Sequence, residues 1–125
     1  MSDEGKPLKQ PTFPECIKKL LPEAASSLQG EQKGWVLRGE HCQVVFWETH
    51  KKGGYKFPRH SHTFDEYAIV LEGSGTRIVG DKVIPIREGD ENYIPAGVEH
   101  ETHVTSDVWR AVDFFANPDW VKVKK

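Results

Sequence analysis

The segment HSHTFDEY, residues 60–67, gathers several side chains of the types that bind metal ions. It contains His60, His62 and Glu66, and it runs directly into the apolar stretch YAIVLEG. Residues two apart on a strand point to the same face, so His60 and His62 are expected to project together. Imidazole nitrogens and carboxylate oxygens are common ligands of divalent transition metals. The spacing therefore favours metal chemistry over an ordinary solvated loop.

Glu66 is expected to open a buried strand. Its alternation partners are Ala68 and Val70, two apolar residues that indicate an interior face. A carboxylate and two imidazoles on that face would be costly to bury unless they were paired. A divalent metal would neutralise the carboxylate and accept a lone pair from each imidazole. Asp65 precedes Glu66 by one residue, so we expect its side chain to point away from such a site, toward solvent.

The elements that must position these residues are predicted to be strands. From residue 34 onward the chain consists of short runs rich in Val, Ile and aromatic residues, separated by Gly, Asp and Pro. This spacing is typical of an all-β sandwich or barrel. The segment VGDK, residues 79–82, is expected to form a tight hairpin turn between GTRIV and VIPIR.

A short helix is predicted before the strands. In PECIKKLLPEA, Pro14 suits a first helical turn and Pro22 should end the helix. Ile17, Leu20 and Leu21 are expected to share its apolar face. The residues before Pro14 are polar and indicate a loose arm.

Two segments match the motifs of the cupin family. The first motif, G-x5-H-x-H-x3-E-x6-G, is met with every spacing intact by Gly54, His60, His62, Glu66 and Gly73. The second, G-x5-P-x-G-x2-H-x3-N, is met by Gly89, Pro95, Gly97 and His100, with Val104 in place of the asparagine. Over residues 34–116 the chain thus resembles small single-domain bacterial cupins.

The resemblance implies an all-β cupin fold, a double-stranded β-helix or jelly-roll barrel. We expect an N-terminal arm and short helix over 1–29, the barrel over 30–118 and a C-terminal tail over 119–125. The family's ligand positions fall on His60, His62, Glu66 and His100, which would bind one divalent transition metal. Fe, Mn, Ni, Co, Cu and Zn all suit three nitrogens and one oxygen, so ligand type does not select among them.

The remaining histidines are expected to lie outside this site. His41 and His50 flank a predicted strand and should be exposed. His103 lies three residues after His100, so alternation turns it to the opposite face.

The layout also resembles the cupins that process unsaturated uronates in pectin and alginate breakdown. Those proteins have a glutamine where Glu66 stands, and an Asp-x-Phe pair that falls on Asp113 and Phe115. The resemblance implies Asp113 as a catalytic proton carrier, with a structural strand-end carboxylate as the alternative. An arginine that follows in that family is replaced here by Asp119. An aspartate would repel a uronate carboxylate, which argues against a uronate substrate.

Other pocket residues are suggested by residue type alone. Tyr93, Trp109 and Phe115 are candidates to line the pocket, and ordinary core or interface positions are the alternative. Arg59 and Arg77 could bind an anionic substrate, although arginines on strands are usually solvated.

Composition excludes several classes of protein. The 125-residue chain has 17 basic and 19 acidic residues, a net charge of −2, so we expect no nucleic-acid partner. No helix-turn-helix segment, signal peptide or bilayer-spanning apolar run is apparent, and we expect a cytoplasmic protein with no membrane association. Cys16 and Cys42 are expected to be reduced thiols, with Cys42 buried in a strand.

Together these features predict a small metal-binding cupin. We expect a metalloenzyme acting on a small polar or carbohydrate-derived substrate by Lewis-acid isomerase or lyase chemistry. An Fe-dependent dioxygenase and a non-catalytic ligand-binding or sensor barrel are the alternatives. Single-domain cupins often pair through sheet edges, so we also expect a homodimer in which the N-terminal arm could add to the interface.

Overall fold

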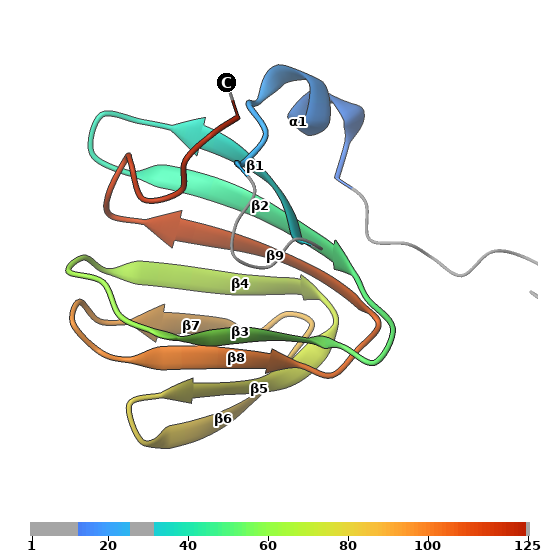
Figure 1. Ribbon diagram of the computed structural model, residues 1–125, viewed down its shortest axis with the longest axis vertical. Coiled ribbons are helices and arrows are strands. Elements are labelled where there is room, and N and C mark those ends of the chain that lie inside the picture. The colour runs from blue at the N-terminus through green and yellow to red at the C-terminus, as the bar shows by residue number, and fades with distance from the viewer. Residues whose placement is uncertain (1–12, 26–31, 125) are drawn as a thin grey trace, which may run out of the picture.

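The computed structural model describes residues 13–25 and 32–124 (Figure 1). Within them, one short helix precedes nine strands: α1 (Glu15–Leu20), β1 (Gln32–Arg38), β2 (Gln43–His50), β3 (Tyr55–His60), β4 (Glu66–Glu72), β5 (Ser74–Val79), β6 (Lys82–Arg87), β7 (Glu91–Ile94), β8 (His100–Val104) and β9 (Val108–Phe115). They form a five-stranded sheet, ordered β1-β2-β9-β4-β7, and a four-stranded sheet, ordered β3-β8-β5-β6. The predicted all-β architecture is confirmed.

On β4 the side chains that the sequence predicted to face the interior are buried. Glu66, Ala68 and Val70 are all buried. The expected hairpin is also present: Val79 pairs with Lys82, and Gly80 takes a φ of 63°, a left-handed conformation that glycine adopts at low cost.

An apolar cluster closes one end of the space between the sheets. It consists of Val70, Ile86, Val104, Trp109 and Ala111. Val104, the residue that departs from the second cupin motif, is 5% exposed and belongs to this core. A valine there contributes to apolar packing and leaves no buried amide to be satisfied. The opposite end of the barrel, where β4 and β8 begin, remains available for polar side chains.

Helix α1 lies beside β1 against the outer face of the five-stranded sheet (Figure 1). Ile17 and Leu21 pack with the cluster of Phe13, Trp35 and Val112. Leu20, however, is 78% exposed, which corrects the prediction that it shares the apolar face. The helix is six residues long, and Leu21 follows Ile17 by about one turn whereas Leu20 points away from the sheet.

Both cysteines are free and exposed, and the predicted burial of Cys42 is wrong. β2 begins one residue later, at Gln43. Cys42 belongs instead to the turn between β1 and β2, where the Gly39 N–H donates to its carbonyl. The apolar run CQVVFW simply starts before the strand does.

The C-terminal segment folds back onto the barrel instead of projecting from it. Val123 bridges Ala24, and the buried Gln43 accepts from the Val121 N–H at 2.7 Å and donates to the Pro118 carbonyl at 2.8 Å. In Figure 1 the C-terminal end consequently lies near α1 and β1. This path carries Trp120 toward the open end of the barrel. Among the described residues no helix is long and apolar enough to span a bilayer.

Candidate metal centre

Four polar side chains from two segments of the sequence converge at the open end of the barrel. His60 ends β3 and is the direct cross-strand partner of His100, which begins β8. His62 lies in the connection to β4, and Glu66 is the first residue of that strand. The ligand nitrogens of the three histidines all lie within 4.8 Å of one another. Glu66 Oε1 lies 2.9 Å from His62 Nε2 and 3.4 Å from His100 Nε2.

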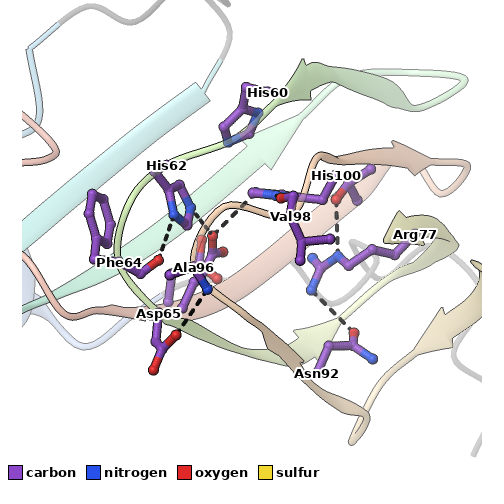
Figure 2. A network of polar contacts seen from close by, with 12 residues as sticks. His60, His62, Phe64, Asp65, Arg77, Asn92, Ala96, Val98 and His100 are labelled. Carbon is purple, nitrogen blue, oxygen red and sulfur yellow. Dashed lines mark hydrogen bonds and ion pairs between the residues drawn. The ribbon is translucent and has the colours of Figure 1, made fainter. Parts of the chain in front are cut away.

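The backbone fixes the same tautomer on all three imidazoles, and Figure 2 shows the contact of His62 with the Phe64 carbonyl as an example. In each, Nδ1 lies 2.8–3.0 Å from a backbone carbonyl oxygen: His60 with Pro58, His62 with Phe64 and His100 with Val98. A carbonyl oxygen only accepts, so each Nδ1 must carry the proton and donate. In the neutral ring the lone pair is then on Nε2, and such a second hydrogen bond is what orients histidine ligands in metal sites.

The Nε2 atoms of His62 and His100 lie next to the negative charge of Glu66. His100 Nε2 is buried and makes no hydrogen bond to any described residue. Burial by itself raises the pKa of Glu66, but the two imidazoles and Arg77 outweigh it and lower that pKa to about 2. Burial lowers the pKa of His60, which favours its neutral, lone-pair-bearing form. Burial by itself lowers the pKa of His62, but its contacts with Glu66 and a backbone carbonyl together outweigh burial and raise that pKa. Without a metal, a proton on His62 Nε2 therefore occupies the place beside Glu66 that a metal cation would take.

The donor set therefore fits a divalent metal ion. The ligand nitrogens of the three histidines form one cluster and Glu66 Oε1 lies beside two of them, so the orphaned His100 nitrogen would gain a partner from a bound ion. The structure brings all four sequence-predicted ligand positions together. The cluster also borders a cavity of about 670 Å³, within the range of roughly 300–1,000 Å³ typical of small-molecule sites.

The cavity wall contains most of the remaining candidates. Trp109, Asp113 and Phe115 alternate along β9 and line the cavity. Trp109 and Phe115 were predicted to do so, and the inward position of Asp113 is the one that its predicted catalytic role requires. Asp113 pairs across the strands with Ala68 of β4, one inward position beyond Glu66. Trp47 Nε1 donates to Asp113 Oδ2 at 3.1 Å. Burial and the negative charge of Glu66 raise the pKa of Asp113 well above its ordinary value, against the opposing effects of Arg77 and Trp47.

Tyr93 does not line the cavity, which corrects the sequence prediction. Its strand, β7, turns Asn92 and Ile94 toward the interior, so alternation turns Tyr93 outward. The side chain is 48% exposed and stacks on Tyr67 with ring centroids 4.9 Å apart. Tyr93 thus belongs to an outer aromatic surface and not to the pocket.

The sequence did not predict Trp120 as a cavity residue, and it left undecided whether Arg77 faces the cavity or solvent. Trp120, in the expected tail, lines the cavity and stacks on His60 with ring planes 16° apart. No local sequence pattern predicts that Trp120 lies here, because its position depends on contacts of Gln43 with residues some 75 positions later. Arg77 is 5% exposed and also lines the cavity, so it is not a solvated strand arginine. Arg59, at the rim, is engaged by Glu99 and Glu101.

The expected outer residues lie outside the centre. His41 and His50 are exposed, and His103 faces Glu101 at 2.6 Å on the other side of β8. Asp65 points away from the metal cluster, as expected, but it is not simply solvated (Figure 2). Its Oδ1 accepts from the Ala96 N–H at 3.0 Å and so ties the second motif to the first.

Comparison with known proteins agrees with this architecture. The family model described as "Cupin domain" matches residues 46–113, more than half of the chain. The "Uncharacterized protein y4oW" of Sinorhizobium fredii is 38% identical over 56 residues, covering 45% of this chain and 24% of that protein. The chain therefore spans about a quarter of the length of that curated relative.

Solved cupin structures share the fold at low sequence identity. An RmlC-like cupin from Shewanella frigidimarina superposes with a TM-score of 0.69 at 21% identity, over 87% of this chain and 90% of the other. KdgF from Halomonas sp. gives 0.64 at 14% identity, over 74% and 86%. Oxalate decarboxylase of Bacillus subtilis, which has Mn(II) centres, gives 0.68 at 16% identity, over 86% and 31%. Family match, barrel topology and converging motif residues agree, and the chain belongs to the cupin family.

Proposed function

We propose that this cupin is a metal-dependent enzyme that moves a proton on a small polar or carbohydrate-derived substrate, in isomerase or lyase chemistry. The observation that carries the proposal is the shared cavity. It places His60, His100 and Glu66 of the histidine cluster beside Asp113, a carboxyl group whose raised pKa favours the protonated form. Pairs of groups with such opposed environments often divide acid and base roles.

His60, His62, Glu66 and His100 would hold one divalent ion, which would act as a Lewis acid toward a substrate carbonyl or hydroxyl. Asp113 is the group that would donate or accept the proton. Trp47 binds its Oδ2, so Oδ1 is the oxygen left to hold and transfer that proton. The aromatic wall of Trp109, Phe115 and Trp120 would exclude water and favour the electrostatic interactions within the cavity.

The substrate is not proposed to be a uronate bound in the manner of the similar uronate-processing cupins. Asp119, at the position of their arginine, is exposed and forms an ion pair with Arg38 at 2.8 Å. It does not line the cavity. The proposed proton transfer rests on the geometry of the metal cluster and Asp113. It does not require the contact between an arginine and a uronate carboxylate.

The donor set of three histidines and one glutamate also suits an Fe-dependent dioxygenase. This remains the second candidate, and a non-catalytic ligand-binding or sensor barrel the third. For all three we place the protein in the cytoplasm, acting on a small molecule. Oxygen consumption separates the second candidate from the first, because proton transfer consumes none.

The proposal is tested by solvent deuterium exchange. Metal-loaded protein is incubated in D₂O with a panel of hydroxy acids, keto acids and reducing sugars, and exchange at carbon is followed by proton NMR. We expect exchange with at least one compound, and a loss of about 10²–10⁴-fold in Asp113→Asn, the usual contribution of an acid–base group. Metal content must stay unchanged in that variant. Exchange as fast in Asp113→Asn as in the wild type would refute the assigned role, and oxygen uptake without exchange would favour the dioxygenase.

A further inference from the structure

A buried arginine lines the cavity beside the metal cluster. Arg77 is 5% exposed, and within the described ranges, 13–25 and 32–124, it is the one lysine or arginine that is buried. Its Nε donates to Thr102 Oγ1 at 3.0 Å and its Nη1 donates to Asn92 Oδ1 at 3.2 Å. Figure 2 shows the side chain between the strands that carry these partners. The guanidinium is thus held in a fixed orientation by two neutral groups.

Arg77 has no ion-pair partner in the part of the chain that the structure describes. Neither Glu66 nor Asp113 has an oxygen within 4.0 Å of its guanidinium, although both feel its charge. Burying a cation without a paired anion is expensive, and neutral hydrogen bonds offset only part of that cost. Because Arg77 also lines the cavity, a ligand can supply the missing negative charge.

The register places this arginine a short distance from the metal cluster. Arg77 pairs with Thr102 on β8, and His100 lies two residues earlier on the same strand and the same face. Two residues along a strand correspond to about 7 Å. A molecule of a few carbon atoms therefore has the length to contact both groups at once.

We propose that Arg77 anchors the carboxylate of the substrate, and that the substrate is a small carboxylic acid with a second oxygen that reaches the His60–His62–Glu66–His100 cluster. A planar guanidinium with free N–H groups matches a carboxylate by two-point contact. A monoanion also suits the charge of the site better than a phosphate dianion. One buried cation faces the cavity, and Glu66 and Asp113 occupy the opposite wall.

This inference rests on the proposed function, because it assigns the substrate class of the same cavity. A purely structural role is the competing explanation, since Arg77 on β5 links Thr102 on β8 to Asn92 on β7 of the other sheet. The two roles differ in one measurable respect. A structural link affects all ligands alike, whereas a carboxylate anchor affects only those ligands that carry the carboxylate.

The test is calorimetric titration with pyruvate and with hydroxyacetone, which retains the carbonyl and lacks the carboxylate. Wild type, Arg77→Met, Arg77→Lys and the control Arg87→Met, at an exposed position outside the cavity wall, are compared as zinc-loaded and as chelator-treated proteins. We expect the wild type to prefer pyruvate and Arg77→Met to lose about tenfold or more of the pyruvate affinity, as for other charged hydrogen bonds. Hydroxyacetone affinity should not change, and Arg77→Lys should recover part of the loss.

Three results would overturn the inference: no preference for pyruvate in the wild type, an unchanged preference in Arg77→Met, or an equal loss for both ligands. If Arg77→Met does not fold, the same criteria apply to Arg77→Lys, which keeps the charge and removes the two-point contact. Zinc content is measured separately. Failure to hold zinc would contradict the proposed metal site, while the pyruvate preference of the chelator-treated proteins would still decide the role of Arg77.

Discussion

Each of the three clustered histidines, His60, His62 and His100, has a backbone carbonyl two residues away that fixes its Nδ1–H. The H-x-H spacing and the position of His100 after its turn are local features, so the sequence predicted which residues converge. The carbonyl contacts and the orphaned His100 nitrogen depend on the three-dimensional backbone and could not be predicted. Arg77 illustrates the same limit, since residue type alone left its burial open.

The role of Glu66 leads to a graded prediction. Glu66→Gln keeps a carbonyl oxygen in place and removes a charge, so metal binding should weaken but persist. Glu66→Leu removes the oxygen, and affinity should fall by more than about 100-fold, beyond the range usual for outer-shell partners of ligands. Competition with a chromogenic chelator measures both values.

Asp65→Asn is the matched control, because Asp65 points away from the cluster and an amide oxygen can still accept from the Ala96 N–H. Its metal affinity should remain within about tenfold of the wild type. Loss of metal from Asp65→Asn together with retention by Glu66→Leu would mean that Glu66 is not a ligand.

At the scale of elements, strand alternation explains both the successes and the misses. In β4 the alternation could be read from sequence, and Glu66, Ala68 and Val70 were assigned correctly to the interior. On β9 no phase was assigned: Trp109 and Phe115 were suggested by residue type and Asp113 by the family resemblance, and all three line the cavity. β7 has only four residues, and its phase was not assigned, which is why Tyr93 was misplaced. The C-terminal segment has no regular pattern, and its return over the barrel depends on buried Gln43.

Trp120 provides a prediction for this returning segment. Its ring stacks on His60 and contacts His62 edge-on with centroids 5.3 Å apart. Trp120→Ala should lower the free energy of unfolding by about 1 kcal/mol, as for other aromatic pairs, and should open the cavity to solvent. Urea unfolding measures the first effect, and faster removal of bound metal by a chelator measures the second.

Val123→Ala is the control in the same segment, because Val123 does not line the cavity. It should leave the rate of metal removal unchanged. If Trp120→Ala also releases metal at the wild-type rate, the tryptophan does not cover the site.

At the scale of the whole molecule, one outer surface remains to be explained. Cross-strand pairs connect Leu37, Val44, Phe114, Tyr67 and Tyr93 in a single row across the five-stranded sheet. Four of these side chains are exposed, and none of the five is charged. Apolar patches of this kind often mark protein interfaces. We place the predicted homodimer on this row.

Sedimentation equilibrium tests this placement. The wild type should be a dimer, and Tyr67→Glu should shift it to the monomer because a charge would be buried at the contact. Val83→Glu, at an exposed position of the four-stranded sheet, should remain dimeric. A monomeric wild type, or a dimer that tolerates Tyr67→Glu, would exclude this surface as the interface.

The central claim is that four side chains hold one divalent metal in the barrel, and elemental analysis of protein purified without a histidine tag tests it most directly. We predict one metal ion per chain in the wild type and none in the double variant His60→Ala, His100→Ala. The barrel should still fold in that variant, because the apolar clusters around Val45, Val70 and Trp35 contain neither His60 nor His100. Full metal content in a folded double variant would contradict the account.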